Sequence, residues 1–293
     1  MPESSATASH VQRGLLLVIG SAFVWSFGGA IARFIATGDS WAIVFWRSAF
    51  AALFLLAFML ARDGPRGTVA LFRNMGLPGV GVGVCFAIGS VSFVLALAHT
   101  TIANILLIQA GAPLVAALLA WVFFRERTSP ATWAAIAAVI TGVAIMVSDS
   151  LSGTVSPLGD GLALMIAIAF SSAIVITRRH AHIRMTPAVF LATIIGAVLS
   201  AFFIKTYIVS LGDLALLFAF GALNLGLGLA FFVTGARLIP AALAALLGTL
   251  ETVLGPVWVW LIHNEVPSRA TIIGGAVVFA ALLAHLLFNW RRR

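Results

Sequence analysis

AWVFFRERTS at residues 120–129 and VWLIHNEVPS at residues 259–268 are two versions of one stretch, and they decide the fold. Both stretches end a long apolar run and lead into another one. The pairing matches Trp121 with Trp260, Glu126 with Glu265 and Ser129 with Ser268. Earlier in each half, GLLLVIGSAF (14–23) resembles GLALMIAIAF (161–170). The chain is therefore an internal repeat of two halves, residues 14–148 and 158–289.

The composition is that of an integral membrane protein. Of the 293 residues, 62% are hydrophobic and only 9% are charged, with a mean hydropathy of +1.13. A soluble domain has about 25% charged residues and could not cover its surface with so few. The net charge of +8 does not indicate nucleic-acid binding, because the basic residues lie in short breaks between apolar runs and form no basic face. The one cysteine, Cys85, excludes an intrachain disulfide.

Ten apolar runs are long enough to cross a bilayer as helices, which takes about 20 residues. They cover residues 14–35, 41–61, 76–98, 101–124, 131–148, 158–177, 187–204, 213–235, 240–262 and 270–289. The runs are too long and continuous for a transmembrane barrel. We therefore predict an all-α membrane protein of ten transmembrane helices. Because each half has an odd number of spans, the two halves cross the membrane in opposite senses, as in secondary transporters.

Arginine and lysine set the predicted orientation. With the N-terminus inside, the inner segments hold 13 of the 17 basic residues and the outer segments hold 3, while Arg47 lies within a span. Both termini are thus predicted to be cytoplasmic.

Several stretches resemble the drug/metabolite transporter superfamily, EamA type, over nearly the whole chain. FVWSFGG, with Trp25, resembles the family's first helix, and FWRSAFAALFL, with Arg47, resembles its second. ALAHTTIANILLIQAGAPLVAALLAWVFFRE (96–126) resembles the long signature of the fourth helix, with Pro113 at the proline. The second copy, residues 234–265, departs from the pattern, since Thr252 stands where proline is expected and a proline follows at Pro256.

Within this family the sequence is most similar to the YddG-type amino-acid exporters. The resemblance implies export of small metabolites, most of all broad or aromatic and neutral amino acids, across the bacterial inner membrane. We expect the lipid bilayer as the environment of the protein, and neither a cofactor nor nucleic acid as a partner. Because both orientations are fused in one chain, the protein is expected to work as a monomer. Alternating access around a central cavity is the expected mechanism, with Pro113 and Pro256 as candidate hinges, although either proline is equally compatible with a static bend.

Polar groups are costly inside a membrane, so they tend to face a cavity or a partner. Glu251 is a lone carboxylate near the middle of the ninth predicted span, and Arg47 lies within the second. Two interpretations remain open. In the first, the two side chains pair with each other or with backbone groups and hold helices together. In the second, they line the cavity and meet the ammonium and carboxylate groups of a substrate. Glu251 is also a candidate for binding a coupling proton.

The other candidate cavity residues have weaker support. Trp25 and Ser26 precede two glycines in the first span and fit either helix packing or a cavity wall. Asn104, Gln109 and Asn224 fit interhelical hydrogen bonding or substrate contact, and Thr252 can bond to its own helix. No grouping of His, Cys, Asp or Glu has metal-ligand spacing.

Two other classes of function compete with a carrier. A membrane-embedded enzyme acting on lipid-linked substrates would need clustered His, Asp, Glu or Ser near an interface, which the chain lacks. A channel is disfavoured by the absence of a repeated charged ring. Exporters of other metabolites or drugs remain the alternative within the same class.

Overall fold

The computed structural model describes residues 2–124, 130–151, 156–180, 182–236, 238 and 241–291. Almost all of this described part is helical, and it contains no strand, which confirms the predicted all-α class. The helices are α1 (Pro2–Ser26), α2 (Gly28–Phe34), α3 (Ser40–Leu97), α4 (Ile102–Gln109), α5 (Ala112–Phe124), α6 (Pro130–Leu151), α7 (Pro157–Arg179), α8 (Thr186–Ala201), α9 (Leu211–Phe218), the π-helix η1 (Ala219–Gly226), α10 (Leu227–Gly235), α11 (Ala241–His263) and α12 (Arg269–Arg291).

Apolar segments of membrane-spanning length run through the described residues. Five of them are long and apolar enough to cross a bilayer, namely Val11–Phe34, Ser40–Leu97, Ile102–Leu119, Pro157–Thr177 and Leu211–Gly235. Shorter apolar helices lie at Trp133–Gly142, Thr186–Ala201, Leu250–His263 and Arg269–Ala281.

The connection between the second and third predicted spans differs from the sequence-based expectation. Residues 62–75, expected to be a loop, are helical, and α3 runs through both spans. Two glycines within α3 have positive φ, 67° at Gly64 and 54° at Gly76, and each breaks the helical path. Glycine adopts this backbone conformation at little cost because it has no Cβ. α3 is therefore three helical pieces joined at two glycine corners.

Three other predicted spans are divided rather than continuous. The first, 14–35, is split at Phe27 into α1 and α2. The fourth, 101–124, is split at Ala110 and Gly111 into α4 and α5, just before Pro113. The eighth, 213–235, passes through the π-helix η1. Helix α11, by contrast, continues past Pro256 without a break.

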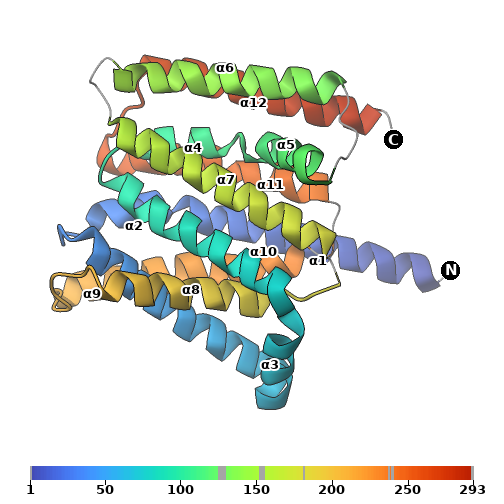
Figure 1. Ribbon diagram of the computed structural model, residues 1–293, viewed down its shortest axis with the longest axis vertical. Helices are drawn as coiled ribbons and strands as arrows, with labels where there is room; N and C mark the ends of the chain where they lie inside the picture. Colours follow the sequence, from blue (N-terminus) through green and yellow to red (C-terminus); the bar gives the residue numbers. More distant parts are fainter. Residues whose placement is uncertain are drawn as a thin grey trace.

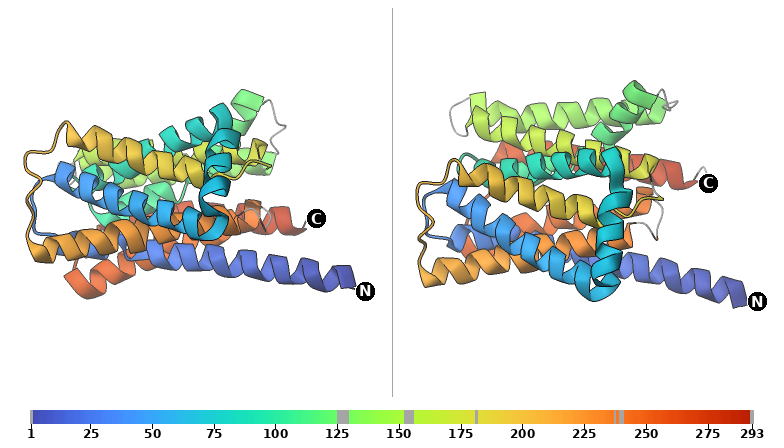
Figure 2. Two further views of the ribbon diagram at one scale, coloured as in Figure 1. Left: turned by 90° about the horizontal axis from the view of Figure 1, so that it is seen from below. Right: turned by 60° about the horizontal axis from the view of Figure 1, so that its bottom comes forward.

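The helices run roughly along one direction, and α6 packs against α12 at one edge of the bundle (Figure 1). Gly142 of α6 approaches so closely that an added Cβ would lie 2.7 Å from the carbonyl oxygen of Gly274 in α12. Small residues permit such close helix approach in membranes. α3 packs against α7 and α8, which brings segments from the two sequence halves together. The N- and C-terminal ends of the chain lie at the same end of the bundle (Figure 2).

An ion pair joins elements at the end of the bundle where the chain termini lie. Arg184 donates two hydrogen bonds to Asp63, at 2.7 and 2.9 Å, and so joins the segment before α8 to α3. The hydrogen bond from Arg184 holds the pKa of the Asp63 carboxyl below its ordinary value.

A second ion pair lies at the opposite end, where α2, α4 and the segment after α11 meet. Arg33 Nε is 3.0 Å from Glu265 Oε2, and Glu265 Oε1 accepts a hydrogen bond from the backbone N–H of Ile102. Arg33 also donates to the carbonyl oxygens of Leu97 and Thr100. One connected set of polar contacts therefore joins these elements at this end of the bundle, and we call it the Arg33–Glu265 lock.

Candidate functional site

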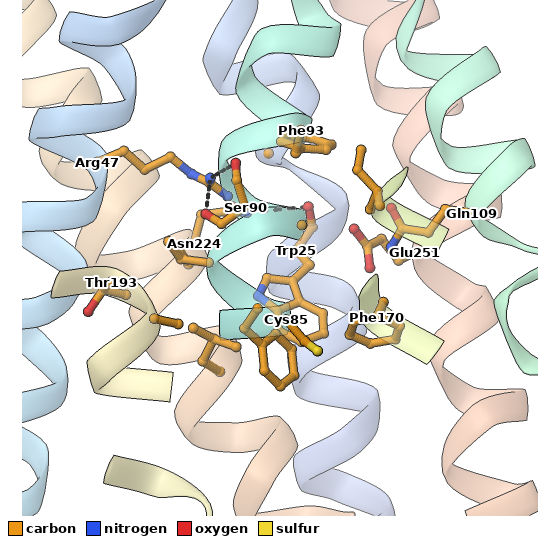
Figure 3. Close-up of a pocket in the computed structure, with 17 residues that line it drawn as sticks. Trp25, Arg47, Cys85, Ser90, Phe93, Gln109, Phe170, Thr193, Asn224 and Glu251 are labelled. Carbon is orange, nitrogen blue, oxygen red and sulfur yellow. Dashed lines mark hydrogen bonds between the residues drawn. The ribbon is translucent and has the colours of Figure 1, made fainter. Parts of the chain in front are cut away.

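A central cavity lies between the two halves of the chain (Figure 3). It has about 750 Å³ of empty space, counted out to its open mouth. Its wall is mostly apolar and aromatic with a few polar groups, the usual character of a small-molecule site. The lining residues are Trp25, Gly28, Arg47, Cys85, Phe86, Gly89, Ser90, Phe93, Gln109, Ile166, Phe170, Ala192, Thr193, Asn224, Leu225, Leu229 and Glu251.

Arg47 provides the positive charge of the cavity. Its side chain is buried, with 6% of its surface exposed. Nη1 donates to Ser90 Oγ at 3.0 Å and approaches the Ser90 carbonyl oxygen at 3.4 Å. The guanidinium carbon lies 4.3 Å from the ring centre of Phe220 and 5.5 Å from that of Phe93, both within the range of cation–π attraction. Arg47 Nε is buried without a hydrogen-bond partner.

Glu251 provides the negative charge, from α11. Figure 3 shows its carboxylate beside Gln109, across the cavity from Arg47. Within the described part of the chain, Glu251 makes no hydrogen bond and forms no ion pair with Arg47. The direct Arg47–Glu251 pair that the sequence left open is therefore not formed in this structure. The cavity holds two opposite charges that do not neutralise each other by contact.

Asn224 connects the cavity to the break between α1 and α2. It lies in the π-helix η1, and its Nδ2 donates to the carbonyl oxygens of Val24 at 2.6 Å and Trp25 at 3.3 Å. These carbonyls belong to the last turn of α1, where the break at Phe27 removes regular helical partners. Single-turn π-helical segments are frequent at functional sites. Asn224 thus lines the cavity while holding the end of α1.

The aromatic wall joins four rings from four helices. Trp25 lies 5.4 Å from Phe232, Phe232 lies 5.9 Å from Phe170, and Phe170 lies 5.7 Å from Phe86, measured between ring centres. Three of these rings, all but Phe232, line the cavity. Trp25 therefore combines the two roles that the sequence left open, since it packs against α10 and also faces the cavity.

Three predicted cavity residues lie outside the cavity lining. Ser26 Oγ donates to the Phe23 carbonyl at 2.6 Å and accepts from Trp258 Nε1 at 3.0 Å. Asn104 donates to Asp160 and to Thr100 at the start of α4 and α7. Thr252, which follows Glu251 in α11, is buried and is not among the lining residues. Trp25, Arg47, Gln109, Asn224 and Glu251 are the predicted residues that the fold brings together.

Several lining residues were missed because their side chains are ordinary ones for a membrane helix. Cys85, Phe86, Gly89, Ser90 and Phe93 all lie on one face of α3, at spacings of three or four residues. That spacing marks a shared helical face, but the sequence does not say which face borders the cavity. The hydroxyl of Ser90 accepts a hydrogen bond from Arg47, a partner that the sequence does not indicate.

The residues that the structure describes form no metal-binding group. Groups of three or more His, Cys, Asp or Glu side chains close enough to hold a metal ion are absent from that part of the chain. The functional groups of the cavity are the guanidinium of Arg47, the carboxylate of Glu251, the thiol of Cys85, two side-chain amides, two hydroxyls and the aromatic rings.

A helical membrane protein with a central bipolar cavity between two repeated halves is the architecture of a carrier. The chain belongs to the EamA-like transporter family, whose profile matches residues 12–148 and 157–287. These two matches fall on the two sequence halves, and they confirm the family resemblance drawn from the motifs.

Two curated relatives are similar over almost their entire length. Both are the pseudopaline exporter CntI of Pseudomonas aeruginosa, from strains UCBPP-PA14 and PAO1. Each is 28% identical over 282 residues, covering 94% of this chain and 96% of the relative. A solved crystal structure, whose title gives no function, matches with a TM-score of 0.65 and 20% identity over 96% of this chain and 98% of its own, and so supports the fold. Family and relatives are transporters, which fits the expectation that the chain is not an enzyme.

The single cysteine gives a direct measure of cavity occupancy. Cys85 lines the cavity and is half-buried, so a small maleimide should modify it in the purified protein. We expect a transported substrate to slow this alkylation several-fold because it fills the same space. The rate is measured by intact-mass spectrometry, with Cys85→Ser as the blank. Equal rates with and without saturating substrate would place the substrate elsewhere.

The Arg33–Glu265 lock makes a second prediction. Glu265→Gln removes its charge while keeping a polar side chain, so the lock weakens and the bundle opens more often at that end. Both side chains are partly exposed, at 32% and 21%, so we expect the free energy of opening to fall by about 1 kcal/mol. This corresponds to about a fivefold rise in the alkylation rate of Cys85 by an impermeant reagent added on that side. Arg269→Gln, an exposed change at the same end, is the matched control. An unchanged rate in Glu265→Gln would show that the lock does not gate the cavity.

Proposed function

We propose that this chain is a secondary transporter that exports amino acids across the bacterial inner membrane. One observation carries the substrate class: the central cavity is lined by two opposite charges, Arg47 and Glu251, that form no direct ion pair with each other. An amino acid carries one carboxylate and one ammonium, so it neutralises both groups at once. A substrate with a single charge would leave the other one buried, which is costly.

The aromatic wall and the scarcity of other polar groups favour a neutral side chain on the substrate. Trp25, Phe86 and Phe170 offer apolar area, whereas no third charged residue lines the cavity within the described chain. Broad neutral or aromatic amino acids therefore fit best.

The proposed topology is that of ten spans in two inverted five-helix halves, residues 14–148 and 158–289, with both termini cytoplasmic. The family profile, which matches twice, supports the two halves. Both termini lie at the same end of the bundle (Figure 2), which supports an even number of membrane crossings. With both orientations in one chain, the site is built without a partner subunit, and we propose that the monomer is the transporting unit.

Alternating access in this proposal uses the helix breaks that border the cavity. Phe27 separates α1 from α2 next to Trp25 and Gly28, and Ala110 and Gly111 separate α4 from α5 next to Gln109. Pro113, which lacks a backbone N–H, supports the second break as a hinge. Pro256 has less support, because α11 passes it without interruption.

Counterflow in proteoliposomes tests the proposal. Vesicles are loaded with an unlabelled compound. The uptake of the same compound in labelled form, in exchange for the unlabelled molecules inside, is then followed. We expect saturable exchange of neutral amino acids such as leucine and phenylalanine. Exchange of pseudopaline alone, the cargo named for the relatives, would replace the amino-acid assignment. Product formation without exchange would instead favour a membrane-embedded enzyme.

A further inference from the structure

The guanidinium group of Arg47 uses only part of its hydrogen-bonding capacity. Among the described residues, its hydrogen bonds to Ser90 come from Nη1, and none comes from the edge formed by Nε and Nη2. The Nε–H is buried and unpartnered in a side chain that is 94% buried, since 6% of its surface is exposed. A buried donor without an acceptor lowers stability, so such groups in native proteins call for a ligand or a water molecule.

The orientation of this edge is fixed by its neighbours. Phe220 and Phe93 stack on the guanidinium at 4.3 and 5.5 Å, and Ser90 holds one terminal nitrogen. Gly221 lets the π-helix η1 pack directly on the backbone of Arg47, because any larger residue would collide with its carbonyl oxygen. The plane of the guanidinium is therefore set before a ligand arrives, which lowers the entropy cost of binding.

We propose that Arg47 is the receptor for the substrate carboxylate, which binds side-on to the Nε–H and Nη2–H edge, and that Ser90 is the residue that positions it. This inference rests on the proposed function and assigns the two ends of the substrate. A planar guanidinium binds a carboxylate through two parallel hydrogen bonds, which a lysine ammonium cannot reproduce. The substrate ammonium then lies on the Glu251 and Gln109 side of the cavity, across from Arg47.

A comparison of acid and amide substrates tests the assignment in the wild-type protein. Leucine and leucinamide have the same ammonium and the same side chain, but only leucine has a carboxylate. In counterflow we expect leucine to be preferred by about tenfold or more, the usual effect of losing a hydrogen bond to a charged group. Equal exchange of leucine and leucinamide would overturn the assignment and leave the proposed function standing.

Two variants separate recognition from a purely structural role. Arg47→Lys keeps the charge but loses the two-point edge, so the preference for leucine over leucinamide should shrink to less than about threefold. Ser90→Ala should raise the KM for leucine several-fold and leave the maximal rate close to that of wild type. Arg62→Lys, a change at an exposed arginine that donates to Thr234, is the matched control and should keep the wild-type preference. An Arg47→Lys protein that transports with an unchanged preference would contradict the role of Arg47.

A binding assay keeps the inference testable if no amino acid is exchanged. That result would make the proposed function wrong, yet Arg47 would still be tested by simple carboxylates. We expect butyrate to protect Cys85 from alkylation and butyramide not to protect it, because Cys85 lines the same cavity. Equal protection by the two compounds, or by neither, would overturn the carboxylate site.

Discussion

Glu251→Gln is expected to abolish amino-acid exchange while leaving the protein folded. Glutamine has nearly the shape of glutamate but carries no charge, so the ammonium of the substrate loses its counter-ion in the cavity. Removing one member of a buried charge pair costs about 2–5 kcal/mol, which corresponds to at least about a thirtyfold loss of exchange at low substrate concentration. The measurement is counterflow with the variant beside wild type, at matched amounts of monodisperse protein.

The result also separates the roles that the sequence left open for Glu251. Loss of exchange with or without a pH gradient assigns the carboxylate to substrate binding. Loss of only the response to an imposed pH gradient assigns it to proton coupling. Wild-type exchange by Glu251→Gln would show that this carboxylate does not contact the substrate.

Gly221→Ala is expected to be the most destabilising single change near the site. A methyl group at this position of η1 would overlap the carbonyl oxygen of Arg47 and lie 2.8 Å from Phe50 Cβ. The first of these atoms belongs to the backbone of α3 and cannot move without bending that helix. Overpacking of this kind costs about 1–3 kcal/mol, and here it also displaces Arg47. We expect a lower midpoint of thermal unfolding in detergent and a lower yield of monodisperse protein.

Gly161→Ala in α7 is the matched control, because nothing lies within 4 Å of an added Cβ there. Alanine favours a helix over glycine by up to about 1 kcal/mol, so this variant should be as stable as wild type or slightly more stable. If Gly221→Ala also unfolds at the wild-type temperature, then η1 and α3 are less closely packed than the structure indicates.

The features of the fold that could be predicted are those set by the length of the apolar runs and by the internal repeat. The all-helical class and the family followed from apolar runs, from the matched stretches at 120–129 and 259–268 and from the motifs around Trp25 and Arg47. The helix breaks were less accessible. Gly64 and Gly76 allow positive φ, but nothing local shows that residues between them stay helical. The π-helix η1 depends on packing against α3 and α1, which sequence patterns do not report.

The candidate site likewise has a part that the sequence indicates and a part that only the structure shows. Arg47 and Glu251 could be identified from the sequence because charged residues are rare inside apolar runs. The neighbours of Arg47 could not be identified in this way, because serine and phenylalanine are common in membrane helices. Only the helix packing places Ser90, Phe93 and Phe220 beside Arg47. Ser26 and Asn104 were expected in the cavity for their polarity, but each bonds to a neighbouring helix instead, Ser26 to Trp258 and Asn104 to Asp160.

The central claim is that an amino acid binds in the cavity between Arg47 and Glu251. A structure of the wild-type protein with an amino acid that carries a heavy atom, such as 4-bromophenylalanine, tests it most directly through the anomalous signal of bromine. The account predicts one bromine peak near the aromatic wall of Trp25, Phe86 and Phe170, with the carboxylate on the Arg47 side and the ammonium on the Glu251 side. A bromine peak outside this cavity, or an empty cavity at a concentration that saturates exchange, would contradict it.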